Sequence, residues 1–553
     1  MQEPKLEHRL TSFNYPQDTK LSKIDTNRES PIISTQNNSL SFRAFVIGTI
    51  LLLSISWVQE LWRFPFNHDN GFILDTSRRL LAGEKLYTDI PEVNPPLIYL
   101  IGSGIALISQ MSGIHEILVW RFCFLLAITL VILFTVHLLK GNGWELENEK
   151  CQSFIWILIA LCFCYSGYDF SQREHIAAVF FLPYIAVCEG RALGRPAQGK
   201  KALLSGLIAG FAFSLKPFFL LVFCLVEIYM WTVLRKIGRP WVRLENITFA
   251  AFSGGFLIWV IFGTPYIEFI RFIQPYYASY NMPISQIVNN RSLFPFILAF
   301  FLNFACKAPN DKPHLRQLLF LTAAGFTLSY VVQMKGFSYH GLPARIFSWL
   351  LVSLIILDLS SAVNRQKTIL YNIARKLSAN LYIFPILYSV LLSVFATNYH
   401  GGLVVQNFMN QIHELGREKR IQLLTFSVFP AFPAFNYYNF QTTQRGSATI
   451  LAKLYQGKDT FRGPFPYQKG SENWHLQQTY IDTTVEDIAI RKPDFIFSDD
   501  NLFRQALGKS RFNFIEFLLL DDRFKLLFKN YHFLKEASGF KIFKRNTESF
   551  YKK

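Results

Sequence analysis

The chain has 553 residues, of which 51% are hydrophobic and only 17% are charged. Because a soluble globular protein carries about a quarter charged residues, this composition excludes that class and indicates a polytopic membrane protein. The formal net charge of +18 does not indicate nucleic-acid binding, since Lys and Arg gather in short loops between apolar segments. Such loops instead set membrane topology and contact anionic headgroups.

The N-terminal residues 1–40 are polar and rich in Ser, Thr, Asn and Gln. This composition predicts a disordered cytoplasmic tail. The tail has neither the basic start nor the apolar core of a cleavable signal peptide, so the first span, at about 43–60, is expected to be an uncleaved signal anchor.

A loop dense in ionisable residues, 61–96, follows the first span. It contains FNHDNGFILDTSRRLLAGEKLYTDIPEVNPPL, in which helical spacing of apolar residues predicts a short helix that ends at Gly83. The double proline that follows Asn94 forces extended backbone before it and allows a second helix after it. Asp69 therefore precedes one predicted helix and Glu92 precedes the other. Asp75 and Arg79 have the spacing of a supporting ion pair within the first helix.

This loop resembles the first extracytoplasmic loop of the integral-membrane glycosyltransferases. They include the protein O-mannosyltransferases, the lipid A aminoarabinose transferases and bacterial relatives that use polyprenyl-phosphate sugars. The resemblance extends over about the first 350 residues and implies a GT-C-type fold. It implies that Asp69 is catalytic and that Glu92, in EVNPPL, is the second acidic residue of the site. Asn70 stands where many members carry Glu, so no role follows for position 70.

Further apolar segments follow at about 97–112, 117–139, 152–165, 175–189, 202–214, 218–235, 247–263, 293–306, 317–333, 343–360 and 380–397. Together with the first span these make twelve segments, and twelve crossings would leave the tail and the C-terminal region on the same side of the membrane. The basic loops place them on opposite sides, so one segment cannot cross. The segment 97–112 is shorter than the ~20 residues that a span needs and is predicted to lie in the outer interface. About eleven spans, give or take two, then form a mainly α transmembrane domain over 41–398.

The region 399–553 has ordinary polarity and predicts a small extracytoplasmic α/β domain. RIQLLTFSV, PDFIFSDD and GFKIFKR are predicted strands, and FNFIEFLLLDDRFKLLFKNY is predicted to be helical.

The predicted topology brings the ionisable residues of several loops to the outer face, where charge at membrane depth indicates function. The candidate substrate-binding residues are Arg173, Glu174, His175, Lys216, Lys335, His340 and Arg345. Three structural alternatives stay open. Arg173, Glu174 and His175 would form a solvated helix start, Lys216 would snorkel to the interface, and His340 would make a structural hydrogen bond.

These residue types suit sugar transfer from a polyprenyl phosphate. A carboxylate whose pKa is raised by burial accepts the proton of the acceptor hydroxyl, and Lys or Arg stabilises the departing phosphate. The sequence shows no carboxylate or histidine cluster that calls for a metal, and no cofactor is expected beyond the donor.

The leading hypothesis is a hexosyl- or pentosyltransferase at the outer face of the bacterial inner membrane. It would act on an envelope glycolipid, a polysaccharide or a protein. The alternatives are a transporter or flippase of a lipid-linked sugar, and a scaffold whose outer domain binds a partner. Transporters usually contain internal repeats, and none is visible in the sequence.

Overall fold

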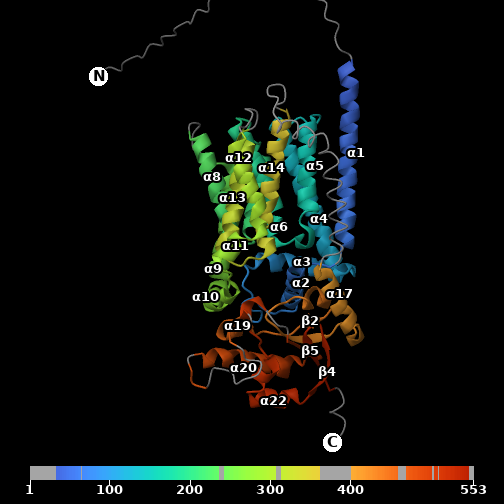
Figure 1. Cartoon of the computed structure of the whole chain (residues 1–553), viewed down its shortest axis with the longest axis vertical. Coiled ribbons are helices and arrows are strands. Elements are labelled where there is room, and N and C mark those ends of the chain that lie inside the picture. The colour runs from blue at the N-terminus through green and yellow to red at the C-terminus, as the bar shows by residue number, and fades with distance from the viewer. Residues whose placement is uncertain are drawn as a thin grey trace, which may run out of the picture.

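The computed structural model describes residues 33–63, 65–235, 242–306, 313–361, 400–458, 469–471, 473–500, 504–508 and 510–546. A bundle of long helices occupies one part of the molecule, and a smaller domain with a β-sheet lies beyond one end of it (Figure 1). The predicted span at 380–397 and most of the predicted tail lie outside the described residues.

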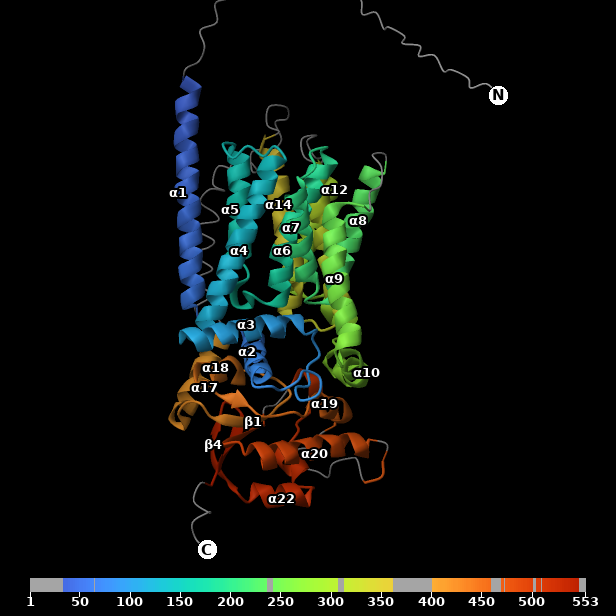
Figure 2. The same ribbon diagram turned by 180° about the vertical axis from the view of Figure 1, so that it is seen from behind.

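Seven helices in the described part of the chain are long and apolar enough to cross a membrane. Five of them lie within α1 (Ile33–Trp62), α4 (Glu116–Gly141), α6 (Arg173–Ala192), α9 (Leu244–Gly263) and α13 (Pro313–Gln333). The other two include α8 (Leu220–Leu234) and most of α14 (Leu342–Ser361) but begin before them, at Pro217 and Ser338. Shorter helices run beside them, namely α5 (Glu149–Phe163), α7 (Gly199–Phe213) and α12 (Phe294–Ala305) (Figure 2). Helix α1 begins before the predicted end of the tail, although its membrane-spanning part starts at Phe42.

Helix α3 (Leu97–Ser112) lies across the end of the bundle rather than along it (Figure 2). This arrangement agrees with the prediction that the segment does not cross. A side chain at Gly102 would collide with Ser77 of helix α2 (His68–Leu81). The Ser77 hydroxyl donates to Tyr99 O at 3.1 Å. Gly102 is therefore needed for close packing between α2 and α3.

Local signals explain why α2 begins and ends where it does. The Asn67 side chain caps its N-terminus, because Oδ1 accepts from Asp69 N at 2.9 Å and from Asn70 N at 3.4 Å. The helix ends before Gly83, which has a φ of +95° that glycine adopts easily. The predicted helix and its end are thus confirmed.

The C-terminal domain contains a five-stranded mixed sheet in the order β2-β1-β3-β5-β4. Its strands are β1 (Arg420–Leu424), β2 (Gln441–Thr442), β3 (Phe495–Asp499), β4 (Tyr531–Ala537) and β5 (Phe540–Arg545). Its helices are α17 (His400–Ile412), α18 (Ala431–Tyr437), α19 (Thr449–Tyr455), α20 (Trp474–Arg491), α21 (Phe514–Leu518) and α22 (Asp522–Phe528). Strand β1 is parallel to β2 and β3, and β5 is antiparallel to β3 and β4.

The three predicted strands are confirmed as β1, β3 and β5. The stretch 512–531 is largely helical, as predicted, but it divides into α21 and α22. The cause is Asp521, whose carboxylate accepts from Arg523 N at 2.8 Å and so caps a new helix.

The domain packs directly on the loop 61–96, which carries Asp69. Asn436 of α18 donates to Gly71 O at 3.0 Å and to Glu116 Oε1 at 2.9 Å. A Cβ at position 71 would meet the Asn436 side chain at 2.6 Å, so glycine permits this approach. Thr442 of β2 also donates to Asp75 through both its hydroxyl and its amide. These contacts fix α2 between the bundle and the domain.

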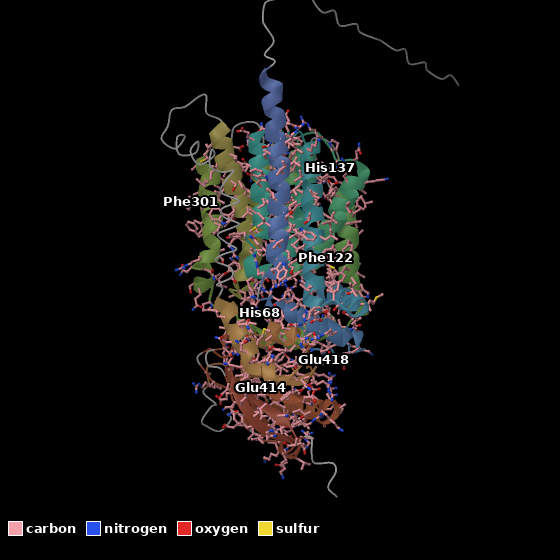
Figure 3. All side chains as sticks on the ribbon, turned by 90° about the vertical axis from the view of Figure 1, so that its right-hand side faces the viewer. His68, Phe122, His137, Phe301, Glu414 and Glu418 are labelled. Atoms are coloured by element: carbon pink, nitrogen blue, oxygen red, sulfur yellow. The ribbon has the colours of Figure 1, made fainter. Side chains whose placement is uncertain are left out.

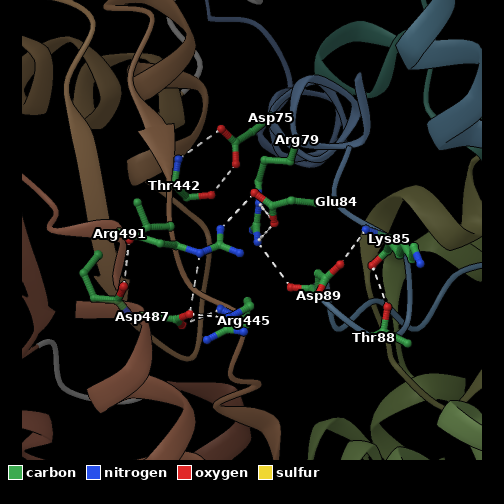
Figure 4. Close-up of polar contacts among 12 residues, drawn as sticks. Asp75, Arg79, Glu84, Lys85, Thr88, Asp89, Thr442, Arg445, Asp487 and Arg491 are labelled. Atoms are coloured by element: carbon green, nitrogen blue, oxygen red, sulfur yellow. Dashed lines mark hydrogen bonds and ion pairs between the residues drawn. The ribbon is translucent and has the colours of Figure 1, made fainter. Parts of the chain in front are cut away.

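A chain of ion pairs forms a second connection between the loop and the domain (Figure 4). Glu84 accepts from Arg79 Nη2 at 2.6 Å and from Arg491 Nη1 of α20 at 2.8 Å. Arg79 also donates to Asp89 O at 3.3 Å. The predicted Asp75–Arg79 pair is wrong, because Asp75 pairs with Arg78 at 3.1 Å while Arg79 turns towards Glu84.

We expect Glu84→Gln to weaken this connection. The change leaves Arg79, which is only 2% exposed, without its carboxylate, so the free energy of unfolding should fall by roughly 1.5–3 kcal/mol. Thermal unfolding in detergent measures the change. Glu414→Gln breaks an exposed pair with Lys535 on the C-terminal domain and should lower the Tm much less. Equal losses in the two variants would contradict a stabilising role for Glu84.

Candidate functional site

Most of the predicted site residues gather at the end of the bundle that faces the C-terminal domain. Helix α2, the turn before α6, the tip between α7 and α8 and the turn before α14 all reach this end (Figure 2). His68, beside Asp69, lies at the junction of bundle and domain (Figure 3). The predicted grouping of these loops on one face is therefore confirmed.

Asp69 is the second residue of α2, and its side chain is 22% exposed. Its Oδ2 accepts from Gln172 Nε2 at 3.3 Å, and its Oδ1 lies 3.5 Å from His68 Nε2. Burial acts to raise the pKa of Asp69, but the charges of His68 and Arg173 and hydrogen bonds from Gln172 and Tyr339 outweigh it and lower the pKa. This direction is opposite to the one we expected, and it keeps the carboxylate ionised at neutral pH.

Glu92 forms the turn that leads into α3. Its Oε1 accepts from Val93 N at 2.8 Å, from Asn94 N at 3.2 Å and from Asn94 Nδ2 at 2.7 Å. Burial raises its pKa, although Arg173 and hydrogen bonds from Asn94 and Tyr99 act in the opposite direction. The contacts show a structural role for one carboxylate oxygen, and the catalytic role of Glu92 stays a prediction.

Arg173 begins α6 and is 4% exposed. Its positive charge acts to lower the pKa of Asp69 and of Glu92, so its side chain acts on both of the predicted catalytic carboxylates of the loop. Among the described residues, its Nε and Nη1 have no hydrogen-bond partner. A buried guanidinium with unpaired donors is costly unless an anion pairs with it. Arg173 is therefore the candidate cation for binding an anionic group.

Two environments were predicted for Lys216, a substrate-binding site or the membrane interface. The structure instead places it among polar side chains of the protein. Its ammonium group donates to Glu174 Oε1 and to Gln333 Oε1, the latter at 3.1 Å, and it lies 3.0 Å from His340 Nε2. These partners occupy all three ammonium hydrogens. Burial lowers the pKa of Lys216 to about 8, while the charge of Glu174 acts to raise it. Snorkelling is wrong for Lys216, and a phosphate would have to displace one of these partners.

We expect Lys216→Gln to destabilise the fold. The carboxylate of Glu174, which is fully buried, would lose its counter-ion, and this loss should cost roughly 3–5 kcal/mol in thermal or denaturant unfolding. Adding Glu174→Gln should recover most of that stability because no uncompensated charge remains. A stable single variant with impaired activity would instead support a phosphate contact by Lys216.

His175 and Arg345 have partners that explain them structurally. His175 Nδ1 accepts from Ser171 N at 3.0 Å, and its Nε2 donates to Cys162 O at 2.7 Å. Both ring nitrogens are thus used within the protein. Arg345 donates to Ser292 Oγ and to Ser338 O, each at 2.9 Å. Substrate contact by either residue stays a prediction.

Lys335 lies against the short helix α10 (Tyr266–Tyr277) and the turn after it. Its Nζ donates to Tyr277 O at 2.9 Å and to Asn281 Oδ1 at 2.7 Å, and it lies 3.9 Å from the centre of the Tyr277 ring. Burial and the charge of Lys216 lower its pKa to about 8. Lys335 thus joins the turn before α14 to α10.

Two residues near Asp69 were not predicted as site residues. Burial raises the pKa of Asp169 to about 7, with Arg345 acting against it and Glu174 and Asp69 acting with it. His68 lies beside Asp69 itself. Asp169 follows a helix of the bundle, as Asp69 does. Its position in YDFSQREHIA is therefore the sequence feature that could have identified it as a site residue. In the described part of the chain, no group of three or more His, Cys, Asp or Glu residues is placed to hold a metal ion.

Comparison with known proteins identifies the fold. No family model and no curated protein matches the sequence. Two crystal structures of ArnT from Cupriavidus metallidurans are similar. The one bound to undecaprenyl phosphate has a TM-score of 0.52 at 12% identity over 91% of this chain and 98% of that chain. The apo structure has a TM-score of 0.54 at 11% identity over 90% of this chain and 97% of that chain.

This similarity shows that the chain has the fold of the two ArnT structures. The fold consists of a transmembrane bundle followed by a smaller domain that contains a sheet.

Proposed function

We propose that this protein is a glycosyltransferase that moves a sugar from a polyprenyl-phosphate donor to an acceptor at the outer face of the bacterial inner membrane. The observation that carries the proposal is the buried Arg173 guanidinium, which has unpaired donors and acts electrostatically on both Asp69 and Glu92. An anionic phosphate beside an ionised carboxylate is the arrangement that such a transfer requires.

We propose the following reaction. The acceptor hydroxyl oxygen forms a bond to the anomeric carbon while the bond from that carbon to the phosphate oxygen breaks. Asp69 accepts the hydroxyl proton, and the bonding electrons leave with the lipid phosphate. Arg173 stabilises the negative charge that develops there. By the resemblance of the loop, the transfer is inverting.

The similar fold of a protein crystallised with undecaprenyl phosphate supports a donor of this lipid class. The transporter alternative fits the structure less well, because transport sites usually lie near the middle of the membrane. Here α2, which carries Asp69, and the start of α6, which carries Arg173, lie at the end of the bundle that faces the C-terminal domain (Figure 1). We propose that this domain, which is joined to α2 through α18, helps to hold the acceptor.

Mass spectrometry of envelope glycolipids, glycans and glycoproteins, with and without the gene, tests the proposal. Without the gene, we expect one acceptor to lack a hexose, pentose or amino sugar and the lipid-linked donor to accumulate. The mass difference identifies the sugar, and the fraction in which it occurs identifies the acceptor class. Unchanged glycan profiles together with an unchanged donor pool would contradict the proposed function.

A further inference from the structure

The turn between α13 and α14, residues 334–341, carries two side chains to the proposed site. The Tyr339 side chain hydrogen-bonds to Asp69. His340 Nε2 lies 3.0 Å from Lys216 Nζ. The position of the turn therefore determines where these two side chains lie.

The beginning of this turn has an unusual backbone conformation. Met334 has a φ of +53° and Gly336 has a φ of +65°, so both lie in the left-handed region. Glycine adopts this region easily, whereas the side chain of a residue such as Met334 disfavours it. Such a conformation persists only where surrounding contacts fix it, and it is most frequent at functional sites. The contacts that fix this turn are therefore candidates for a role in function.

The end of α10 and the residues after it hold one side of the turn. Met282 N donates to Met334 O at 2.7 Å. Lys335 Nζ donates to Tyr277 O at 2.9 Å and to Asn281 Oδ1 at 2.7 Å. Both the backbone and a side chain of the turn are thus bound to the α10 segment.

The C-terminal domain contacts both segments through one side chain, Gln505, which begins the short 3-10 helix η7 (Gln505–Leu507). Its Nε2 donates to Tyr280 O at 2.9 Å and to Lys335 O at 3.3 Å. A single amide group therefore joins the domain to the α10 segment and to the turn before α14.

A second glutamine of the domain contacts the α10 segment alone. Helix α19 lies beside α10 (Figure 2), and Gln456, which follows α19, donates from Nε2 to Ser279 O at 2.9 Å. Among the described residues, Gln456 makes no hydrogen bond to the turn 334–341. The two glutamines thus differ in whether they reach the turn.

We propose that Gln505 is a positioning residue through which the C-terminal domain holds the turn 334–341, and with it Tyr339 and His340, at the site of sugar transfer. This inference rests on the proposed function, because it assigns the turn a task in that reaction. A group displaced by about 1 Å from its productive position can cost about 100-fold in rate. Gln505 therefore acts on kcat through the turn.

Two replacements at position 505 separate hydrogen bonding from packing. Gln505→Met keeps the length of the side chain and removes both amide hydrogens. Gln505→Glu keeps its size and shape but turns an oxygen towards the two carbonyl oxygens, so it should weaken the contact at least as much. If Gln505 only filled space, Gln505→Glu would be the milder change. Gln456→Met is the matched control, because it removes an amide contact to the α10 segment and none to the turn.

Hydrogen–deuterium exchange of the purified full-length chain measures the turn directly and needs no substrate. Peptides that cover 334–341 should exchange at least about threefold faster in Gln505→Met and Gln505→Glu, because losing an anchoring contact favours local opening. They should exchange at the wild-type rate in Gln456→Met.

Steady-state transfer from a polyprenyl-phosphate sugar measures the consequence for the reaction. We expect kcat to fall by about 5- to 50-fold in both position-505 variants, with KM changed by less than about threefold. Gln456→Met should stay within about twofold of the wild type in kcat. If Gln505→Met does not fold, Gln505→Asn carries the same predictions, because it keeps the amide and shortens its reach by one methylene.

Unchanged exchange over 334–341 in the position-505 variants would overturn the inference. Equal effects of Gln505→Met and Gln456→Met, or a loss that appears only in KM, would also overturn it. If the wild-type protein itself transfers no sugar while the exchange results hold, the proposed function fails instead. The two failures are therefore distinguishable.

Discussion

Replacing Asp69 by Asn should abolish sugar transfer while the protein stays folded. The substitution is nearly isosteric, and the remaining carbonyl oxygen can still accept a hydrogen bond from Gln172. The amide cannot accept the proton of the acceptor hydroxyl at neutral pH. We expect kcat to fall by about 10²- to 10⁴-fold, which is the usual contribution of a positioned acid or base. Steady-state turnover with a defined polyprenyl-phosphate sugar measures the loss.

Asp89→Asn is the matched control, because it removes one negative charge from the same loop. Asp89 Oδ2 accepts from Lys85 N at 2.9 Å, and the variant keeps an oxygen for that contact. Its activity should stay within about twofold of the wild type, as expected for a change that removes no transition-state contact. Near-normal turnover by purified Asp69→Asn protein would remove Asp69 from the reaction.

Arg173→Gln should produce the second large loss. In the proposed reaction, the Nε and Nη1 of Arg173, which have no partner among the described residues, would donate charge-assisted hydrogen bonds to the departing phosphate, and removing such a donor typically costs about 10²- to 10³-fold in kcat. Undecaprenyl phosphate should raise the Tm of the wild-type protein, since a ligand that binds only the folded state stabilises it. It should raise the Tm of the variant much less.

Two further variants distinguish phosphate binding from a general effect of charge. Arg173→Lys keeps the charge but loses the planar fork of donors, so it should recover only part of the activity. Arg316→Gln removes a buried arginine whose Nη2 donates to Asn303 O at 2.6 Å and to Cys306 O at 2.7 Å. It should lower Tm without lowering kcat. Arg173→Gln protein with unchanged kcat and an unchanged response to undecaprenyl phosphate would contradict the role of Arg173.

Features with local signals were predictable from the sequence. The glycine at position 83 and the double proline define the end of α2 and the start of α3, and each acts within a few residues along the chain. The shortness of the segment 97–112 predicted that α3 does not cross. Strands β1 and β3 are mostly buried, and their apolar composition identified them.

Features that depend on distant residues were not predictable. Lys216 pairs with Glu174 and contacts His340, which lie 42 and 124 residues away, so the neutralised cluster has no local signature. The interior of β4, with residues such as His532 and Phe533, is largely exposed, and its composition does not indicate a strand. Arg79 likewise pairs with Glu84 rather than with its helical neighbour Asp75. Glu84 also pairs with a residue of α20.

The proposed function requires the protein to cleave a polyprenyl-phosphate sugar and to transfer the sugar. The most direct measurement is mass spectrometry of lipids and acceptors after purified protein in proteoliposomes is incubated with a polyprenyl-phosphate sugar and envelope extract. We expect the wild type to form equal amounts of free polyprenyl phosphate and glycosylated acceptor. We expect Asp69→Asn to form neither product. Movement of the intact donor across the bilayer without cleavage would contradict the account and support a transporter.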